Sequence, residues 1–180
     1  MQLSVEEKLL RTAYRLVSFR PRSEREMRQF LLKKTKKQYV NSGVLDTVID
    51  RMRELGYVDD RAFAAWWIEQ RRTFRPKGIL ALTMELRRKG IAREIIDDVL
   101  PRSGSSSDSA PDDASSERAL ALRAIERRMA RLRKLPVTEK RRKMYAFLRQ
   151  RGFTAQTILG VVDELTGKDY NTTKENYDEW

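Results

Sequence analysis

The sequence contains no cysteine and no histidine. Without cysteine, disulfide bonds and thiolate metal sites are excluded, and a reducing compartment is expected. Without histidine, the chain lacks the commonest general base of enzymes and the commonest metal ligand. The sequence also shows no glycine-rich phosphate loop and no nucleophile–base arrangement. We therefore expect a protein that is not an enzyme and that has no catalytic residues, no metal site and no cofactor.

Long apolar runs and strand patterns are missing as well. No apolar run approaches the roughly 20 residues that cross a bilayer. The N-terminal segment has early acidic residues and no continuous apolar stretch, which is unlike a secretory signal. We therefore expect a cytoplasmic protein without a membrane partner. Since no alternating β-branched run of useful length occurs, the predicted fold class is all-α.

Charged residues, by contrast, are abundant. Lys and Arg number 38 against 26 Asp and Glu, which gives a formal net charge of +12. Such an excess favours a polyanionic partner or an acidic protein surface over solubility alone. The excess is greatest over residues 118–166, where thirteen basic side chains face four acidic ones.

One helical pattern recurs along the chain. Segments 76–100 and 138–165 both place apolar residues at helical spacing around a basic turn, which contains Gly90 in one segment and Gly152 in the other. A looser copy covers residues 23–56. Repeated helical units stack into arrays that present a binding surface rather than a pocket. The repeat therefore indicates a binding protein.

Short polar residues mark the helix ends. Ser4 and Ser23 each precede an apolar-faced segment and have a glutamate three residues later, which is the capping-box pattern. Gly56 is predicted to end the third helix. Adjacent Asp59 and Asp60 suggest metal or acid–base chemistry at first sight, but neighbouring side chains at a helix start point in different directions. We interpret one of them as the cap of the fourth helix.

The predicted helices group into three units. We assign a first three-helix unit to residues 1–56, a second to 57–101 and a third to 118–166. Residues 102–117 are rich in Ser and Asp and contain no large apolar side chain, which is typical of a flexible linker. Residues 167–180 are predicted to be a disordered tail.

Basic side chains cluster at helix ends of the second unit and throughout the third. A helix C-terminus stabilises one or two cations, typically by about 0.3–1 kcal/mol each, but this does not explain whole clusters. We therefore treat them as candidate contacts with a polyanion or an acidic protein. The candidates are Arg71, Arg72, Arg75, Lys77, Arg87, Arg88, Lys89, Arg127, Arg128, Arg131, Arg133, Lys134, Lys140, Arg141, Arg142, Lys143, Arg149 and Arg151.

Three motifs follow one another in the first hundred residues. They are PRSEREM at Pro21–Met27, RELGYVDDRAFAAWWIEQR at Arg53–Arg71 and MELRRKGI at Met84–Ile91. In this order and spacing they resemble the RecX family, the regulators of the RecA recombinase. The resemblance covers residues 5–100, with weaker support from residues 118–165.

The resemblance implies tandem three-helix units in an elongated, curved array. It also implies a non-enzymatic protein that binds the RecA–single-stranded-DNA filament, typically along its groove. Members of that family typically lower ATP hydrolysis and strand exchange by RecA, and block filament growth or promote disassembly. Direct contact with single- or double-stranded DNA stays open, and we expect a monomer. The candidate cations then become candidate contacts with the filament.

The sequence departs from the family pattern at three places. The second turn of the first unit, Lys33–Gly43, is longer than the usual Lys-Gly-Tyr turn. Arg75–Gly78 displaces the glycine that usually precedes the fifth helix, and the acidic linker resembles an insertion. These departures bear on how the units pack rather than on the family resemblance.

A second interpretation is a basic helical nucleic-acid binder without RecA specificity. The turns at Lys89–Ile95 and Arg151–Ile158 resemble the link that precedes a groove-reading helix. The helices after these turns become mainly apolar, however, and lack the exposed polar residues that read bases. A third interpretation, an enzyme, is disfavoured by the missing residue types.

Overall fold

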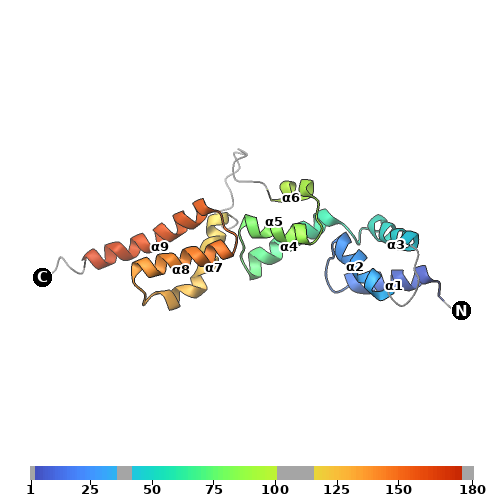
Figure 1. Cartoon of the computed structure of the whole chain (residues 1–180), viewed down its shortest axis with the longest axis horizontal. Coiled ribbons are helices and arrows are strands. Elements are labelled where there is room, and N and C mark those ends of the chain that lie inside the picture. The colour runs from blue at the N-terminus through green and yellow to red at the C-terminus, as the bar shows by residue number, and fades with distance from the viewer. Residues whose placement is uncertain (1–2, 36–41, 101–115, 176–180) are drawn as a thin grey trace. The chain divides into compact units, whose positions relative to one another are not determined.

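The computed structural model describes residues 3–35, 42–100 and 116–175, with side chains described up to residue 167. Over these residues the chain forms helices and no strand (Figure 1), so the predicted all-α tandem repeat is confirmed. None of the described helices is long and apolar enough to cross a membrane. The helices are α1 (Val5–Val17), α2 (Glu24–Thr35), α3 (Ser42–Glu54), α4 (Asp60–Phe74), α5 (Ile79–Arg88), α6 (Arg93–Val99), α7 (Glu117–Leu132), α8 (Val137–Gln150) and α9 (Ala155–Glu175).

The chain divides into two compact units. Unit 1 comprises Met1–Ile68 and Glu85–Ser103, and unit 2 comprises Glu69–Met84 and Gly104–Trp180. The division therefore falls within α4 and within α5, the helices of the predicted second three-helix unit. The sequence-based unit boundaries and the elongated, curved arrangement of the units stay predictions.

The core of unit 1 forms where α1, α2 and α3 pack on one another. Each helix contributes apolar residues at helical spacing, which places them on a single buried stripe. Burying one large aliphatic side chain contributes about 1.5–3 kcal/mol, so these stripes hold the three helices together. The buried side chains are Leu9, Ala13, Leu16, Met27, Leu31, Leu45, Val48, Ile49, Met52 and Val58.

The core of unit 2 forms in the same way from α7, α8 and α9. It is built around aromatic and aliphatic side chains, with Phe153 in the turn between α8 and α9 fully buried. The buried cluster comprises Leu120, Ala121, Ala124, Ile125, Leu132, Met144, Phe147, Leu148, Phe153, Ile158, Val161 and Val162.

The predicted helix caps are present. The Ser4 hydroxyl accepts a hydrogen bond from the Glu7 N–H at 3.1 Å, and the Glu7 carboxylate accepts one from the Ser4 N–H at 2.7 Å. The Asp59 carboxylate accepts from the N–H groups of residues 61 and 62, at 2.8 and 3.0 Å, and so caps α4. Asp60 instead accepts from the Glu24 N–H of α2 at 2.9 Å. Asp59 is therefore the cap of α4, whereas Asp60 binds a backbone amide at the start of α2.

The recurring glycine turn is confirmed at the level of backbone hydrogen bonds. Gly90 has a φ of +86° and Gly152 a φ of +75°, the left-handed conformation that glycine adopts without a Cβ penalty. After each glycine the next N–H donates to the carbonyl five residues earlier, from Ile91 to Leu86 and from Phe153 to Leu148. The same pattern follows α3, so all three turns are Schellman caps.

The C-terminal region differs from the sequence-based prediction. The disordered tail was predicted from residue 167, but α9 continues to Glu175. No proline interrupts this stretch, and an isolated glycine in a helix costs only about 1 kcal/mol, so the backbone hydrogen bonding of α9 extends beyond its apolar stripe. Residues 176–180 and most of the predicted linker, residues 102–115, lie outside the described residues.

Candidate binding surface

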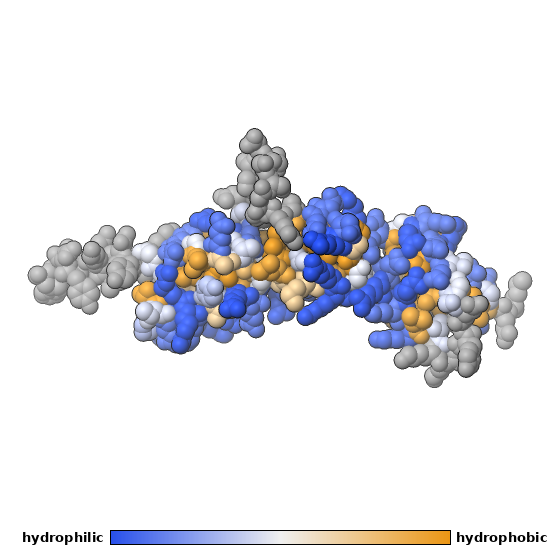
Figure 2. Space-filling view, turned by 45° about the horizontal axis from the view of Figure 1, so that its top comes forward, coloured by the Kyte–Doolittle hydropathy of each residue, from blue (hydrophilic) through white to orange (hydrophobic). Residues whose placement is uncertain are grey.

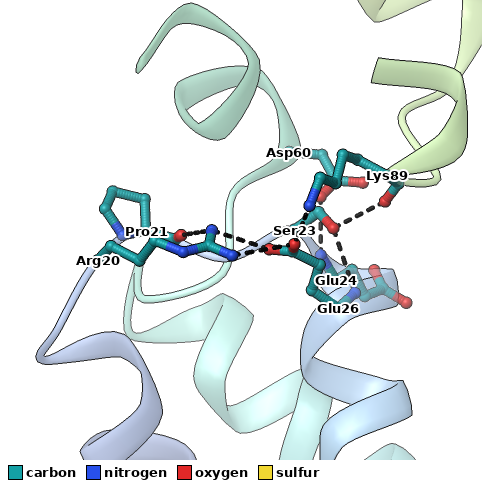
Figure 3. A network of polar contacts seen from close by, with 7 residues as sticks. All are labelled: Arg20, Pro21, Ser23, Glu24, Glu26, Asp60 and Lys89. Atoms are coloured by element: carbon teal, nitrogen blue, oxygen red, sulfur yellow. Dashed lines mark hydrogen bonds and ion pairs between the residues drawn. The ribbon is translucent and has the colours of Figure 1, made fainter. Parts of the chain in front are cut away.

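A polar network in unit 1 joins the end of α5 to the start of α2 (Figure 3). The Ser23 hydroxyl donates a hydrogen bond to the Lys89 carbonyl at 2.7 Å. Gly90 follows directly, and a Cβ added there would lie 2.6 Å from the side chain of Arg25. The close approach therefore needs glycine at position 90 as well as the left-handed turn.

Glu26 lies at the centre of this network (Figure 3). Its carboxylate accepts two hydrogen bonds from the Arg20 guanidinium, both at 3.1 Å, and forms an ion pair with the Lys89 ammonium. Burial raises the pKa of Glu26, but the hydrogen bonds from Arg20 and Lys89 outweigh it and the net pKa is lowered. Lys89 also lies 4.7 Å from the ring centroid of Trp67. This candidate contact residue is therefore engaged within unit 1.

Unit 2 contains a junction of the same kind, between the end of α8 and the start of α5. The Gly78 N–H donates to the Arg151 carbonyl at 3.0 Å, and the Leu80 N–H donates to the Gly152 carbonyl at 3.1 Å. The Arg151 guanidinium donates to the Pro76 carbonyl at 2.9 Å.

In both junctions, the backbone carbonyl of the basic residue before the glycine accepts a hydrogen bond. The donor lies at the N-terminal end of the middle helix of the preceding repeat, which is α2 in one junction and α5 in the other. The side chains of the same residues add contacts, from Lys89 to Glu26 and from Arg151 to the Pro76 carbonyl, which gives the basic–glycine pair of the repeat a structural role.

An arginine cluster forms beside the junction of unit 2. The guanidinium carbons of Arg128 and Arg151 lie 4.3 and 4.8 Å from the ring centroid of Phe147. The pKa of Arg151 is lowered, first by burial and then by repulsion from Arg75, Arg128 and Arg127. Since these like charges disfavour one another, an anion beside them is stabilised, and arginine forks match phosphate and carboxylate oxygens.

The structure thus brings together candidates that the sequence placed in separate clusters. Arg75 follows α4, whereas Arg127 and Arg128 belong to α7 and Arg151 ends α8. We call these four residues the arginine cluster. Further exposed candidates of unit 2 are Arg131, Arg133, Lys134, Arg142, Lys143 and Arg149.

One face of α8 adds an aromatic side chain to these cations. Arg142 and Arg149 line a shallow depression together with Tyr145, at the spacing of successive helical turns. Ala146 and Gln150 complete the lining. Among the described residues, this surface combines guanidinium groups with a partly buried phenol ring, which suits an anionic partner with apolar parts.

Other candidates of unit 2 are engaged inside it. Lys140 is only 5% exposed. Arg141 donates to the Thr166 hydroxyl at 2.8 Å and pairs with Asp163, and Lys143 pairs with Glu139 at 2.9 Å. We therefore keep Lys140 and Arg141 out of the proposed contact surface.

The remaining candidates lie around the α4–α5 turn and at the end of α5. Arg71, Arg72 and Lys77 are half-buried in unit 2. Arg87 and Arg88 are exposed in unit 1, in the last turn of α5. Of the candidate contact residues in unit 1, Arg87 and Arg88 therefore face solvent, whereas Lys89 pairs with Glu26.

The two tryptophans of α4 are half-buried rather than free to stack on bases. The Trp67 indole N–H donates to the Glu85 carboxylate at 2.9 Å. The Arg20 guanidinium carbon lies 5.9 Å from the Trp66 ring centroid, and the Phe63 ring packs on both indoles. These contacts favour the core interpretation of the aromatic cluster.

Glu117 is a structural residue that the sequence did not single out. Its carboxylate accepts hydrogen bonds from the Ile79 N–H at 3.1 Å and from the Thr154 and Thr157 hydroxyls at 2.7 Å each. It therefore joins the start of α7 to the starts of α5 and α9. The only sequence signal is a pair of threonines three residues apart before an apolar run, a common helix-start pattern.

The described residues present a largely charged surface (Figure 2). Figure 2 shows hydrophilic residues over much of the visible face, with smaller apolar patches among them. No group of three His, Cys, Asp or Glu side chains that could hold a metal ion occurs among the described residues.

Two family models match the chain. The first, described as the second three-helix domain of RecX, matches residues 59–100. The second, described as the third three-helix domain of RecX, matches residues 116–162.

Curated relatives and solved structures agree with these matches. The chain is 34% identical over 146 residues to the regulatory protein RecX of Pelodictyon phaeoclathratiforme, covering 81% of each chain. It is 36% identical over 159 residues to the regulatory protein RecX of Mycobacterium sp. (strain JLS), covering 86% of this chain and 80% of that protein. The crystal structure of RecX from Lactobacillus salivarius superposes with a TM-score of 0.69 at 18% identity, over 89% of this chain and 96% of that one. This structural likeness concerns the fold alone.

Proposed function

Because this chain belongs to the RecX family of regulatory proteins, we propose that it binds the RecA–single-stranded-DNA filament and mainly inhibits it. In this proposal the protein is not an enzyme. It lowers the ATP hydrolysis, strand exchange and growth of the filament by binding to it.

The arginine cluster of unit 2 is the observation that carries the proposal. The guanidinium groups of Arg128 and Arg151 lie over one Phe147 ring, and the pKa of Arg151 is lowered by burial and then by repulsion from Arg75, Arg128 and Arg127. The net charge of +12 attracts a filament whose DNA is a polyanion. The cluster offers bidentate contacts to phosphate or carboxylate oxygens of that filament.

The repeated helical units support a mechanism based on several weak contacts. Units in series bind neighbouring sites of a periodic filament, so the total affinity exceeds that of each contact if the linker permits simultaneous engagement. Binding that favours one filament geometry opposes the rearrangements of ATP turnover in proportion to its differential affinity for the two states.

A charge-reversal variant tests the proposal. Arg127→Glu, Arg131→Glu and Lys134→Glu together change three exposed cations of α7 and its C-terminal end, while Arg128 keeps its contact with Phe147. We expect at least about a tenfold loss in inhibition of single-stranded-DNA-dependent ATP hydrolysis by RecA, roughly 1.4 kcal/mol. Helicity by circular dichroism should stay unchanged.

A matched control makes three charge reversals in unit 1. Lys8→Glu, Arg25→Glu and Lys33→Glu alter exposed cations outside unit 2. This control should change inhibition less than threefold. Equal losses in the two triple variants would contradict the proposed role of the unit 2 surface.

The second candidate function is DNA binding without RecA specificity, which the basic surface favours by itself. The protein is titrated well below one molecule per recombinase, with and without excess single-stranded DNA. Inhibition that persists with spare DNA supports a filament-directed regulator. Inhibition that disappears identifies competition for the strand.

A further inference from the structure

Unit 1 carries a groove between α1 and α2 that the proposed function does not use. The groove has a volume of about 820 Å³ and contains basic and aromatic side chains but no acidic one. Its lining residues are Arg11, Thr12, Arg15, Leu16, Phe19, Phe30 and Lys34. A groove of this kind between two helices accommodates a short peptide segment.

The cations of the groove are set apart from the ion-pair network of unit 1. Arg20, Arg28 and Arg53 all pair with carboxylates of the same unit. Among the described residues, Arg11 and Arg15 form no ion pair, and both are exposed on successive turns of α1. The positive charge of the groove is therefore not neutralised by the fold.

The groove also exposes apolar surface. Phe19, directly after α1, is 77% exposed, which is the largest exposed fraction among the large apolar residues described. Phe30 is half-buried in α2, and the Lys34 ammonium lies 5.7 Å from its ring centroid. The buried Leu16 lies in the lining as well.

We propose that this α1–α2 groove binds an acidic peptide segment that carries an aromatic or aliphatic anchor. The carboxylates of such a segment complement Arg11, Arg15 and Lys34, while its anchor packs against Phe19. A single nucleic-acid strand fits less well, because sequence-independent strand binding stacks successive bases on successive aromatic rings. In this groove the Lys34 ammonium already lies over the Phe30 ring, so Phe19 is the one aromatic ring of the lining that remains for base stacking.

This inference goes beyond the proposed function, because the groove shares no residue with the arginine cluster. Its test needs neither recombinase nor a filament, so its failure and the failure of the proposed function are distinguishable. The probe is a short fluorescein-labelled peptide of Asp and Glu around one Phe and one Leu. One matched peptide replaces the acids by Asn and Gln, and another replaces Phe and Leu by Ser.

Fluorescence anisotropy with the full chain measures the binding. We expect the acidic, Phe-containing peptide to bind and each matched peptide to bind at least about tenfold more weakly. Binding of the acidic probe should become about tenfold weaker when Arg11→Gln, Arg15→Gln and Lys34→Gln are combined. It should become about threefold weaker with Phe19→Ser alone. Phe19 is mostly exposed, so its replacement leaves the core intact.

A control with the same change in net charge distinguishes binding in the groove from general electrostatic attraction to the positively charged protein. Lys33→Gln, Arg51→Gln and Arg93→Gln together remove three exposed cations of unit 1 outside the groove, and should weaken binding less than twofold. The inference is overturned if the probe does not bind, or if both triple variants weaken it equally. It is also overturned if a short oligothymidylate binds the groove more tightly than the peptide, or if groove variants only abolish self-association of the chain.

Discussion

Glu26 shows at the residue scale how a charged side chain serves the fold rather than a partner. Its carboxylate forms ion pairs with Arg20 and Lys89, which belong to two different segments of the chain. Because the Glu26 side chain is only 16% exposed, water screens these ion pairs only in part. Its pKa is lowered, which means that the folded chain stabilises the charged form. The stability that Glu26 contributes is therefore present above its ordinary pKa of 4.5 and is lost as the pH falls through the lowered value.

The variant Glu26→Gln tests this assignment. At neutral pH we expect it to lower the free energy of unfolding by about 2 kcal/mol, because charge-assisted hydrogen bonds from two cations are lost. The difference from the parent chain should shrink as the pH falls from 4.5 through the lowered pKa, where the Glu26 carboxyl becomes protonated and, like Gln, uncharged. Urea titrations over a pH series measure it.

Glu54→Gln is the matched control, because Glu54 forms an exposed pair with Arg51 on α3. Such pairs contribute about 0–1 kcal/mol. Asp60, whose pKa burial raises, gives the parent chain an opposite slope, but it is common to all variants and cancels in the difference. A pH-independent difference for Glu26→Gln would contradict the ion-pair assignment.

Helix starts are the decisive feature at the scale of elements. The Glu117 carboxylate lies at the starts of α5 and α9, where unpaired N–H groups and the helix dipole favour negative charge. It also accepts from two threonine hydroxyls. One side chain therefore fixes the start of α5 and the start of α9 on α7.

Replacing Glu117 by Gln should destabilise unit 2 by roughly 2 kcal/mol, since the amide provides fewer acceptor positions and no charge. Hydrogen exchange should become faster at the N–H groups of Ile79 and Thr154, which donate to it. Glu126→Gln, an exposed acid on the same helix, should leave both exchange rates unchanged. Equal effects of the two variants would show that Glu117 does not join the helices.

At the scale of the whole molecule, charge and repetition work together. The net charge of +12 acts over long range, whereas the repeated junctions position individual cations. If the proposed filament binding holds, the half-inhibitory concentration for RecA ATP hydrolysis should rise steeply with potassium chloride, because each neutralised phosphate releases counterions. The α7 charge-reversal variant should show a shallower dependence on salt, and a dependence equal to that of the parent chain would contradict a role for these cations.

The sequence determined the local features of this protein. Apolar spacing, Ser4, the Asp59–Asp60 pair and the glycine turns predicted the helices and their ends, because these depend on backbone conformation and on hydrogen bonds within a few residues. The motifs from Pro21 to Ile91 also indicated the family. The course of α9 beyond residue 166 was missed, since the apolar stripe ends before the backbone hydrogen bonds do.

Only the tertiary structure decided which charges are paired and which face solvent. Arg75 and Arg151 lie far apart in the sequence, yet the pKa of Arg151 is lowered by burial and then by repulsion from Arg75. The sequence predicted Lys89 and Lys140 to be surface cations. In the structure Lys89 pairs with Glu26, and Lys140 is buried. The reason is physical: a helical pattern assigns a side chain to a face of its helix, whereas its partners come from the helices that pack there.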